Sequence, residues 1–210
     1  MSPLIDFFFG QYSTYAPLDI AIEITAVLLG LASVWYAKQN KVAVYPTGMI
    51  STALFVYLLL KWGLIGDMLI NAYYFIVSIY GWYFWIQKRE GETLHPISRI
   101  TRREVALGVF LFLLSLGFVY KIYQLFALWN GWTAYVDTFT TAIFFVGMWL
   151  MARRKIEHWL FWIVGDIISV PLYFHKGLTL TSIQYIIFTI IAVYGYRSWK
   201  ATLNSTPQTA

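Results

Sequence analysis

The sequence has no cysteine and little charge. Because none of its 210 residues is cysteine, disulfides, thiol chemistry and cysteine-ligated metal sites are excluded, and the redox compartment is left open. Only 12% of the residues are charged, whereas a soluble domain has about a quarter. The first fifteen residues contain no Lys or Arg, so the basic region of a signal peptide is missing there. The low charge predicts a membrane protein.

Long apolar runs are what the sequence has instead. Hydrophobic residues make up 60% of the chain and aromatic residues 20%. A helix needs about 20 mostly apolar residues to cross the hydrocarbon core of a bilayer. We predict an all-α membrane protein of one compact domain, with seven transmembrane helices over residues 18–37, 44–62, 65–86, 105–128, 134–152, 158–175 and 178–196.

The placement of basic residues predicts the orientation in the membrane. Lys and Arg gather on the cytoplasmic side of membrane helices. If the N-terminus lies outside, twelve of the fifteen Lys and Arg residues fall on the inner side, many of them in the long polar connection at 87–104. We therefore predict N-out and C-in, and we attribute the net charge of +5 to topology rather than to nucleic acid binding.

The two halves of the chain resemble each other at an offset of 114 residues. At this offset Trp35 aligns with Trp149 and Lys41 with Lys155. Identity is low, but the matches fall at helix ends and loops. The offset superposes the first three helices on the last three and leaves the fourth as a connector, which makes the halves parallel. Secondary transporters use such repeats and bind substrate between them near the middle of the membrane.

The repeat predicts a 3+1+3 division of the chain. Two triple-helix bundles are joined by a cytoplasmic loop and a linker helix, between an extracytoplasmic N-terminal segment and a disordered cytoplasmic tail. In chain order, the N-terminal segment, first bundle, loop, linker helix, second bundle and tail are residues 1–17, 18–86, 87–104, 105–128, 134–199 and 200–210.

A carboxylate interrupts the sixth predicted helix. Asp166 lies about eight residues into this helix, or roughly 12 Å deep at 1.5 Å per residue. A charge near the bilayer centre costs at least about 2.5–3.5 kcal/mol, so it usually faces a cavity or a partner. The spacing places three other side chains on the same helix face: Trp159, Trp162 and Ser169. Indoles beside a carboxylate suit a flat aromatic cation, so we predict a substrate site; packing against a neighbouring helix is the alternative.

Other polar residues in the predicted helices are candidates for the same site. Asn71 and Gln184 could form amide hydrogen bonds either to a ligand or between helices. Thr141 could contact the substrate, although threonines more often bond to their own helix. Three residues near helix ends are candidates for a gate or vestibule, with simple hydration or interfacial placement as the alternative: Glu23, Asp137 and His158.

Other classes of protein are less well supported. An intramembrane aspartyl protease needs two carboxylates that share a proton, but Asp137 and Asp166 are predicted to differ by about 9 Å in depth. A structural membrane protein would bind no small molecule. A channel is disfavoured because no filter-like loop is present, and ATP-driven transport because the sequence lacks a GxxxxGK[ST] loop. Proton coupling stays open, since a buried carboxylate can titrate.

The sequence resembles the PnuC family of bacterial nicotinamide riboside transporters over nearly its whole length. The resemblance runs through IEITAVLLGLASVWYA and INAYYFIVSIYGWYFW in the first half, and through KIEHWLFWIVGDIISV and GLTLTSIQYIIFTIIAVYGYRSW in the second. The strongest motif of the family is Glu-Asn-Trp-x-x-Trp-x-x-x-Asn. Glu157, Trp159 and Trp162 match this motif, whereas His158 and Asp166 stand where the family has Asn.

The resemblance implies a fold similar to the SWEET sugar transporters and a homotrimer embedded in the lipid of the bacterial cytoplasmic (inner) membrane. It also implies facilitated diffusion of a substrate that a cytoplasmic kinase then traps. Nicotinamide riboside and thiamine are both flat cations that suit Asp166, and the family has branches for each. The family as a whole favours the riboside, whereas an acid in place of an amide favours thiamine, whose aminopyrimidine donates hydrogen bonds. We expect neither an enzyme nor a cofactor.

Overall fold

The structure is a computed structural model that describes residues 15–63, 65–89, 91–127, 129, 131–175 and 179–205. These residues form seven helices and a two-stranded hairpin. The helices are α2 (Pro17–Lys38), α3 (Val44–Lys61), α4 (Ile65–Ile86), α5 (Arg102–Leu125), α6 (Trp132–Ala152), α7 (His158–His175) and α8 (Thr179–Ser205). The strands β1 (Lys88–Arg89) and β2 (Glu92–Thr93) lie between α4 and α5. Most of the predicted N-terminal segment and the end of the predicted tail lie outside the described residues.

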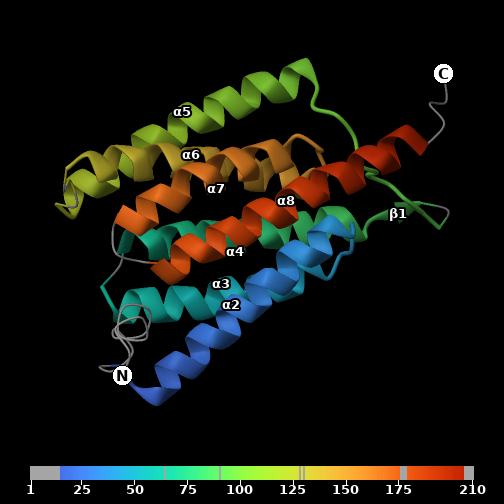
Figure 1. Cartoon of the computed structure of the whole chain (residues 1–210). Helices are drawn as coiled ribbons and strands as arrows, with labels where there is room; N and C mark the ends of the chain where they lie inside the picture. The colour runs from blue at the N-terminus through green and yellow to red at the C-terminus, as the bar shows by residue number, and fades with distance from the viewer. Residues whose placement is uncertain are drawn as a thin grey trace.

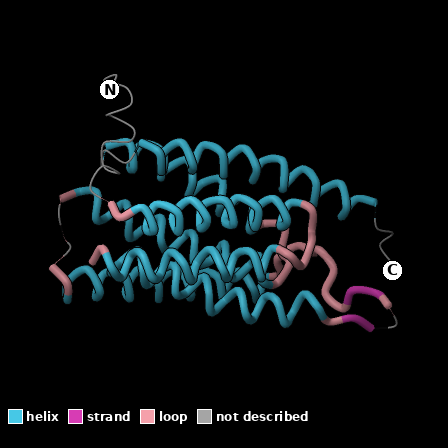
Figure 2. The backbone as a smooth tube through the Cα atoms, turned by 90° about the horizontal axis from the view of Figure 1, so that it is seen from below, coloured by secondary structure: helices cyan, strands magenta, loops and turns pink. Residues whose placement is uncertain are grey.

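The all-helical membrane class predicted from composition is confirmed. Five of the helices, α2 to α6, contain stretches long and apolar enough to cross a membrane. In the described part of the chain α7 and α8 do not meet the same criterion; α7 carries Asp166 and two histidines. Seven crossings therefore stay a prediction, although α7 and α8 lie lengthwise beside the other helices (Figures 1 and 2).

Local signals set several helix boundaries. Pro17 occupies the start of α2, where its missing N–H costs no hydrogen bond. α5 begins before the predicted residue 105, because Thr101 and Glu104 form a capping box in which each side chain bonds to the backbone N–H of the other. α8 continues to Ser205, beyond its predicted end at residue 196, so the first part of the predicted tail is helical.

Two three-helix bundles lie side by side (Figure 1). In the first bundle α3 packs against both α2 and α4, and in the second bundle α7 packs against both α6 and α8. The bundles meet along two seams, α2 against α8 and α4 against α6. α5 lies on the outside of the second bundle, mainly against α6. The helices run lengthwise between the same two ends of the molecule (Figure 2).

One end of the molecule carries the hairpin and is called the loop end below. α2, α4, α6 and α8 all finish at this end (Figure 1). Residues 94–101, called the strap, were predicted to form part of a polar loop, but they fold against the turn between α6 and α7. The backbone N–H of Ser98 donates to the Arg154 carbonyl oxygen at 3.1 Å, and that of Ile156 donates to the Ser98 carbonyl oxygen at 3.0 Å.

The interior is most fully buried along α6 and at the loop end. Most residues of α6 are buried, whereas α5 exposes large apolar side chains such as Phe110 and Leu113, as lipid contact requires. At the loop end, aromatic side chains from both bundles join one buried cluster: Tyr45, Trp85, Trp159 and Trp199.

Candidate functional site

Asp166 lies in the interior of the second bundle, near the middle of α7, and is only 2% exposed. Gly165, which precedes it, allows α6 and α7 to approach closely, because a Cβ at this position would collide with the ring of Phe144. The approach stacks Phe144 on Trp162, with ring centroids 5.3 Å apart. α6 and α7 therefore place an acid beside two large aromatic rings.

Four aromatic rings form a connected group beside Asp166, called the ring cluster below. Phe144 also stacks with Tyr185 of α8 at 6.2 Å, and Trp162 meets Tyr74 of α4 edge-on at 6.1 Å. Asp166 interacts electrostatically with both Tyr74 and Tyr185. The group joins rings from α4, α6, α7 and α8, and those of α4 and α8 interact with the carboxylate, so both bundles contribute to it.

No basic side chain neutralises Asp166 within the described part of the chain. An isolated carboxylate in the membrane interior is costly, so such a residue usually serves a substrate or ion path. The ion pairs of the described residues join other acids: Lys61 with Asp19 at 2.6 Å, Arg153 with Glu104 at 3.1 Å, and Lys155 with Glu104 at 3.0 Å.

His158, which the sequence makes a candidate for a gate or vestibule, is fully buried rather than hydrated. Its ring centroid lies 4.4 Å from that of Trp159 and 4.7 Å from that of Trp199. Trp199 of α8 therefore packs against the start of α7. Nδ1 of His158 donates to the Lys155 carbonyl oxygen at 2.7 Å, which leaves Nε2 as an acceptor.

Trp159 shares a helix face with Trp162 but joins a different group of rings. Its indole lies against the backbone of α8 at Gly195, where a Cβ would collide with it. Its ring also meets Trp199 edge-on, with centroids 5.8 Å apart. The structure therefore places Trp162 beside Asp166, and places Trp159 in the buried cluster at the loop end.

The other predicted ligands lie on four helices, α4, α6, α7 and α8. Ser169 is 1% exposed, and its hydroxyl oxygen has no hydrogen-bond partner among the described residues. Thr141 is buried on α6, and Gln184 is half-buried on α8. The side-chain amide of Asn71 donates to the Asp67 carbonyl oxygen of its own helix at 2.9 Å, which favours a local role for it.

Carboxylates from both bundles lie toward the end opposite the loop end. Asp137 of α6 interacts electrostatically with Tyr173 and Tyr185. Asp67 of α4 interacts with the same two tyrosines, and the sequence analysis missed it although it is an acid in the first turn of a predicted helix. Glu23 is half-buried on α2. Acidic groups therefore flank the ring cluster on the side away from the loop end.

The sequence analysis identified only one ring of the ring cluster. It found Trp162 from its spacing to Asp166, but it missed Tyr74, Phe144 and Tyr185, which come from three other helices. A signal was present at Gly165, since a glycine next to a buried acid marks a place where another helix approaches closely. That signal does not say which side chain fills the space.

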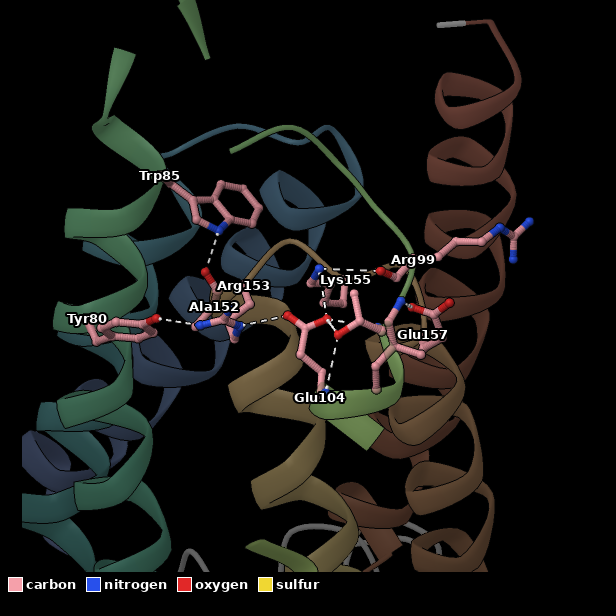
Figure 3. Close-up of polar contacts among 10 residues, drawn as sticks. Tyr80, Trp85, Arg99, Glu104, Ala152, Arg153, Lys155 and Glu157 are labelled. Atoms are coloured by element: carbon pink, nitrogen blue, oxygen red, sulfur yellow. Dashed lines mark hydrogen bonds and ion pairs between the residues drawn. The ribbon is translucent and has the colours of Figure 1, made fainter. Parts of the chain in front are cut away.

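A polar network fixes the turn between α6 and α7 at the loop end (Figure 3). Glu157, which matches the family motif, accepts a hydrogen bond from the backbone N–H of Ile100 in the strap at 2.9 Å. Arg153 links Glu104 at the start of α5 to the hydroxyl of Tyr80 on α4, at 3.1 and 3.3 Å. The motif glutamate therefore holds the strap to the start of α7.

An open groove in the structure does not lie at Asp166, which is only 2% exposed. The groove, of about 510 Å³, lies between α2 and α8, and Trp35, Lys41 and Ile187 contribute to its walls. Access to Asp166 therefore requires the rings or the bundles to move. Among the described residues, no group of three or more His, Asp or Glu side chains is placed to hold a metal ion.

Comparison with known proteins matches this arrangement to a family of transporters. The sequence profile of the nicotinamide mononucleotide transporter family matches residues 20–201. The nicotinamide riboside transporter PnuC of Escherichia coli (strain K12) is 27% identical over 208 aligned residues, which cover 85% of this chain and 84% of that protein. The riboflavin/roseoflavin transporter RibM of Streptomyces davaonensis is 27% identical over 129 residues, which cover 59% of this chain and 58% of that protein.

A solved structure has the same fold. The crystal structure of the vitamin B3 transporter PnuC superposes with a TM-score of 0.68 at 23% sequence identity, covering 96% of this chain and 90% of that one. These relatives are transporters rather than enzymes, as the sequence predicted. The resemblance first noted in the motif of α7 is thereby confirmed, and the chain belongs to the nicotinamide mononucleotide transporter family, together with the PnuC proteins.

Proposed function

We propose that this chain imports a planar, cationic B-vitamin compound across the bacterial cytoplasmic membrane, with nicotinamide riboside as the leading substrate. The proposal depends mainly on Asp166, a buried acid without a basic partner in the described structure, surrounded by the ring cluster. A cation is attracted both by the carboxylate and by the faces of the rings. The names of the relatives, for nicotinamide riboside and for riboflavin, support transport of a vitamin.

Each predicted ligand has a role in this proposal. Asp166 supplies the counter-charge, and Trp162 supplies a flat surface for the aromatic ring of the substrate. Ser169, Thr141 and Gln184 supply hydrogen bonds, of which the hydroxyl of Ser169 is the best prepared because it has no partner among the described residues. Asn71 stays a candidate for substrate binding. Glu23, Asp137 and Asp67 are candidates for a vestibule on the side away from the loop end. Trp159 and His158 act at the loop end instead.

Thiamine is the second candidate. Asp166 stands where the family motif has Asn, and a carboxylate accepts hydrogen bonds from the aminopyrimidine of thiamine better than an amide does. His158, the other departure from the motif, does not add to this case, because it is packed between Trp159 and Trp199. The relatives named for nicotinamide riboside favour the riboside.

We also propose the parallel 3+1+3 repeat of the SWEET-like fold, with α5 as the linker. Exchanging the two bundles turns the seam of α2 and α8 into the seam of α6 and α4, and both seams are present. Asn40 and Arg154, which correspond at the offset of 114 residues, follow α2 and α6 and both adopt positive φ, 54° and 53°. The residues between 18 and 199 divide accordingly into the two predicted bundles, the loop and the linker.

The remaining features of the proposal concern orientation and mode of transport. The loop end is assigned to the cytoplasm, because most basic residues lie in the segments that end there. Transport is proposed to be facilitated diffusion in a homotrimer, with a cytoplasmic kinase that traps the substrate. Counterflow in vesicles without an ion gradient tests the passive mode, and strict dependence on a proton gradient would contradict it.

Calorimetric titration of the purified protein with nicotinamide riboside and, separately, with thiamine tests the substrate. We expect at least one of them to bind, and we expect Asp166→Ala to weaken binding by about 10- to 100-fold, the value of a charge-assisted contact. Asp166→Asn, which introduces the residue of the family motif, should preserve riboside binding better than thiamine binding. Trp82→Phe, on the exposed side of α4, is the control. Binding of neither compound, or undiminished binding by Asp166→Ala, would refute the proposal.

A further inference from the structure

Two tryptophans join the bundles at the loop end by reciprocal hydrogen bonds. Nε1 of Trp85 on α4 donates to the carbonyl oxygen of Ala152 at the end of α6, at 3.1 Å (Figure 3). Nε1 of Trp199 on α8 donates to the carbonyl oxygen of Ala37 near the end of α2, at 2.9 Å. Each indole therefore crosses from one bundle to the other and bonds to a carbonyl oxygen at a helix end. The Ala37 carbonyl oxygen also accepts from the backbone N–H of Asn40 at 2.9 Å. The two indole bonds are called the tryptophan latch below.

The donor indoles of the latch, Trp85 and Trp199, correspond at the offset of 114 residues, as do the rings that they meet, Tyr45 and Trp159, whereas the acceptors Ala37 and Ala152 differ by one residue from this register. Tyr45 meets Trp85 edge-on at 5.1 Å with the ring planes at 87°, and Trp159 meets Trp199 edge-on at 5.8 Å with the planes at 90°. The two latch indoles lie 5.9 Å apart. All four residues are no more than 2% exposed, so they form a continuous aromatic plug between the bundles.

The plug lies between the ring cluster and the loop end. On α4, Tyr74 of the ring cluster, Ser78 and Trp85 follow at helical spacing on one face. On α7, Trp162 of the ring cluster follows Trp159 of the plug by one turn of the same face. A substrate that leaves Asp166 toward the loop end therefore has to pass the plug.

Polar atoms without partners are buried in and beside the plug. Among the described residues no hydrogen bond reaches the hydroxyl of Tyr45, Nε1 of Trp159 or Nε2 of His158, and each of these residues is at most 1% exposed. A buried polar group without a partner is costly. The cost is removed if the bundles separate at this end and water or a polar substrate reaches these atoms. The latch bonds favour the closed arrangement, and the unpaired atoms favour an open one.

We propose that the tryptophan latch is a gate of the transport path, which closes the loop end and opens when Trp85 and Trp199 release the two carbonyl oxygens. This inference rests on the transport function proposed above. The gate adds Trp85, Trp199 and Tyr45 to the functional residues. It also gives the buried Trp159 and His158 a role as the surface against which Trp199 closes.

The two halves of the latch are held unequally. The guanidinium group of Arg154 lies 4.2 Å from the ring centroid of Trp85, and its Nη1 donates to the His95 carbonyl oxygen of the strap at 2.8 Å. The position equivalent to Arg154 is Asn40, which brings no cation to Trp199. We therefore expect the Trp199 half to be the weaker one and to release first.

The absence of cysteine from the chain allows a direct test. A single cysteine at Ser78, which is 3% exposed and lies between Tyr74 and the latch, reports water access behind the plug. The reporter is combined with Trp85→Phe, with Trp199→Phe and with both, since phenylalanine keeps a ring but removes the N–H donor. The rate of reaction with a charged, water-soluble thiol reagent is measured on membrane vesicles of either orientation.

Two controls separate a gate from general loosening of the structure. Trp82→Phe removes an indole from the exposed side of α4 near the latch. A second reporter, Ser182→Cys, is 4% exposed near the start of α8, at the end opposite the loop end. Trp82→Phe should change the labelling rate at position 78 by less than twofold. The latch variants should change the labelling rate at position 182 by less than twofold.

We expect the double variant to speed labelling at position 78 by about tenfold, and only from the side that the loop end faces, because two hydrogen bonds are lost. Trp199→Phe alone should act more strongly than Trp85→Phe. An unchanged rate at 78, or equal increases at 78 and 182, would overturn the gate. If labelling behaves as expected but the wild-type protein neither transports nor binds nicotinamide riboside or thiamine, the gate stands and the proposed function fails.

Discussion

The two bundles make the same helix contact with different side chains. In the first bundle Gly30 of α2 faces Ser51 of α3, whose hydroxyl donates to the Ala26 carbonyl oxygen at 2.7 Å. At the equivalent positions of the second bundle, α6 has Phe144 and α7 has Gly165, so the glycine has changed helices and a ring fills the space. A glycine packed against a hydrogen-bonding serine holds two helices together. A phenylalanine ring packed on a glycine instead presents a flat apolar face.

A second pair of positions differs in the same sense. Ser33 of α2 lies against Gly48 of α3, and its hydroxyl donates to the Val44 carbonyl oxygen at 2.7 Å. The equivalent positions of the second bundle hold Gly147 and Trp162. Both exchanges place rings beside the one buried acid of α7. Under the function proposed above, the first bundle acts mainly as a scaffold, while the second carries most of the proposed binding residues.

The difference between the two bundles is tested most directly at Asp166. Asp166 corresponds to Thr52, whose hydroxyl donates only within its own helix, to the Gly48 carbonyl oxygen at 2.9 Å and that of Met49 at 3.2 Å. We expect Asp166→Ala to reduce vesicle uptake by about 100-fold or more, since a cation would lose its counter-charge. Thr52→Ala should leave uptake within about twofold of wild type. Equal losses for the two variants would show that both bundles bind substrate.

The next largest effect is expected from substituting the glycines Gly165 and Gly30. Gly165→Ala should lower the free energy of unfolding by about 1–3 kcal/mol and displace Phe144, because the new methyl group overlaps its ring. Gly30→Ala should cost about 1 kcal/mol or less, since its methyl group meets only the Ser51 hydroxyl oxygen, 3.1 Å away. Thermal unfolding in detergent measures both variants. Substrate affinity should fall only for Gly165→Ala, and a fall for both would contradict the division of roles.

The strap is bound to the turn between α6 and α7, which belongs to the second bundle. Glu157→Gln keeps the shape of the side chain but removes the charge that accepts from Ile100, so it should cost about 1 kcal/mol of local stability. Hydrogen exchange in residues 94–101 should become faster, with little change in the turn between α2 and α3. Exchange that stays as slow as in wild type would show that the backbone bonds of Ser98 suffice to hold the strap.

The smallest effect concerns pH. Burial, and then the charges of Arg153 and Arg154, lower the pKa of His95 below its usual range. The folded strap therefore prefers the neutral imidazole, and stability present above the ordinary pKa of about 6.5 is lost as the pH falls below it. Exchange in the strap should rise modestly between pH 7 and pH 5, and His95→Gln should remove the dependence. A strap that loosens as the pH rises would reverse the assigned sign.

Much of the fold follows from local patterns. The lengths of the apolar runs predicted all seven helices, with ends that differ mainly at α5 and α8, where a capping box and a helical tail extend them. Asp166 could be singled out because a charge inside an apolar run stands out without any knowledge of the fold. The match of Glu157, Trp159 and Trp162 to a family motif could also be found from sequence.

The side chains that form the site were much harder to predict from the sequence. Phe144 and Tyr185 lie on apolar helices with many similar aromatic residues, and nothing local separates those that meet Asp166 from those that face outward. The burial of His158 could not be predicted for a related reason, since it comes from a helix that is distant in sequence. Trp85 and Trp199 lie near helix ends, where aromatic residues typically form an interfacial belt, so nothing local marks them as contacts between the bundles.

The sequence by itself determined that this chain is a helical membrane protein, that an acid lies deep in its second half, and which family it joins. Those properties depend on composition, on spacing along one helix and on motifs. Only the tertiary structure decided which rings surround the acid and that two indoles fasten the bundles. Such contacts join residues as far apart as Trp199 and Ala37, 162 positions along the chain, and their geometry is set by how whole helices pack.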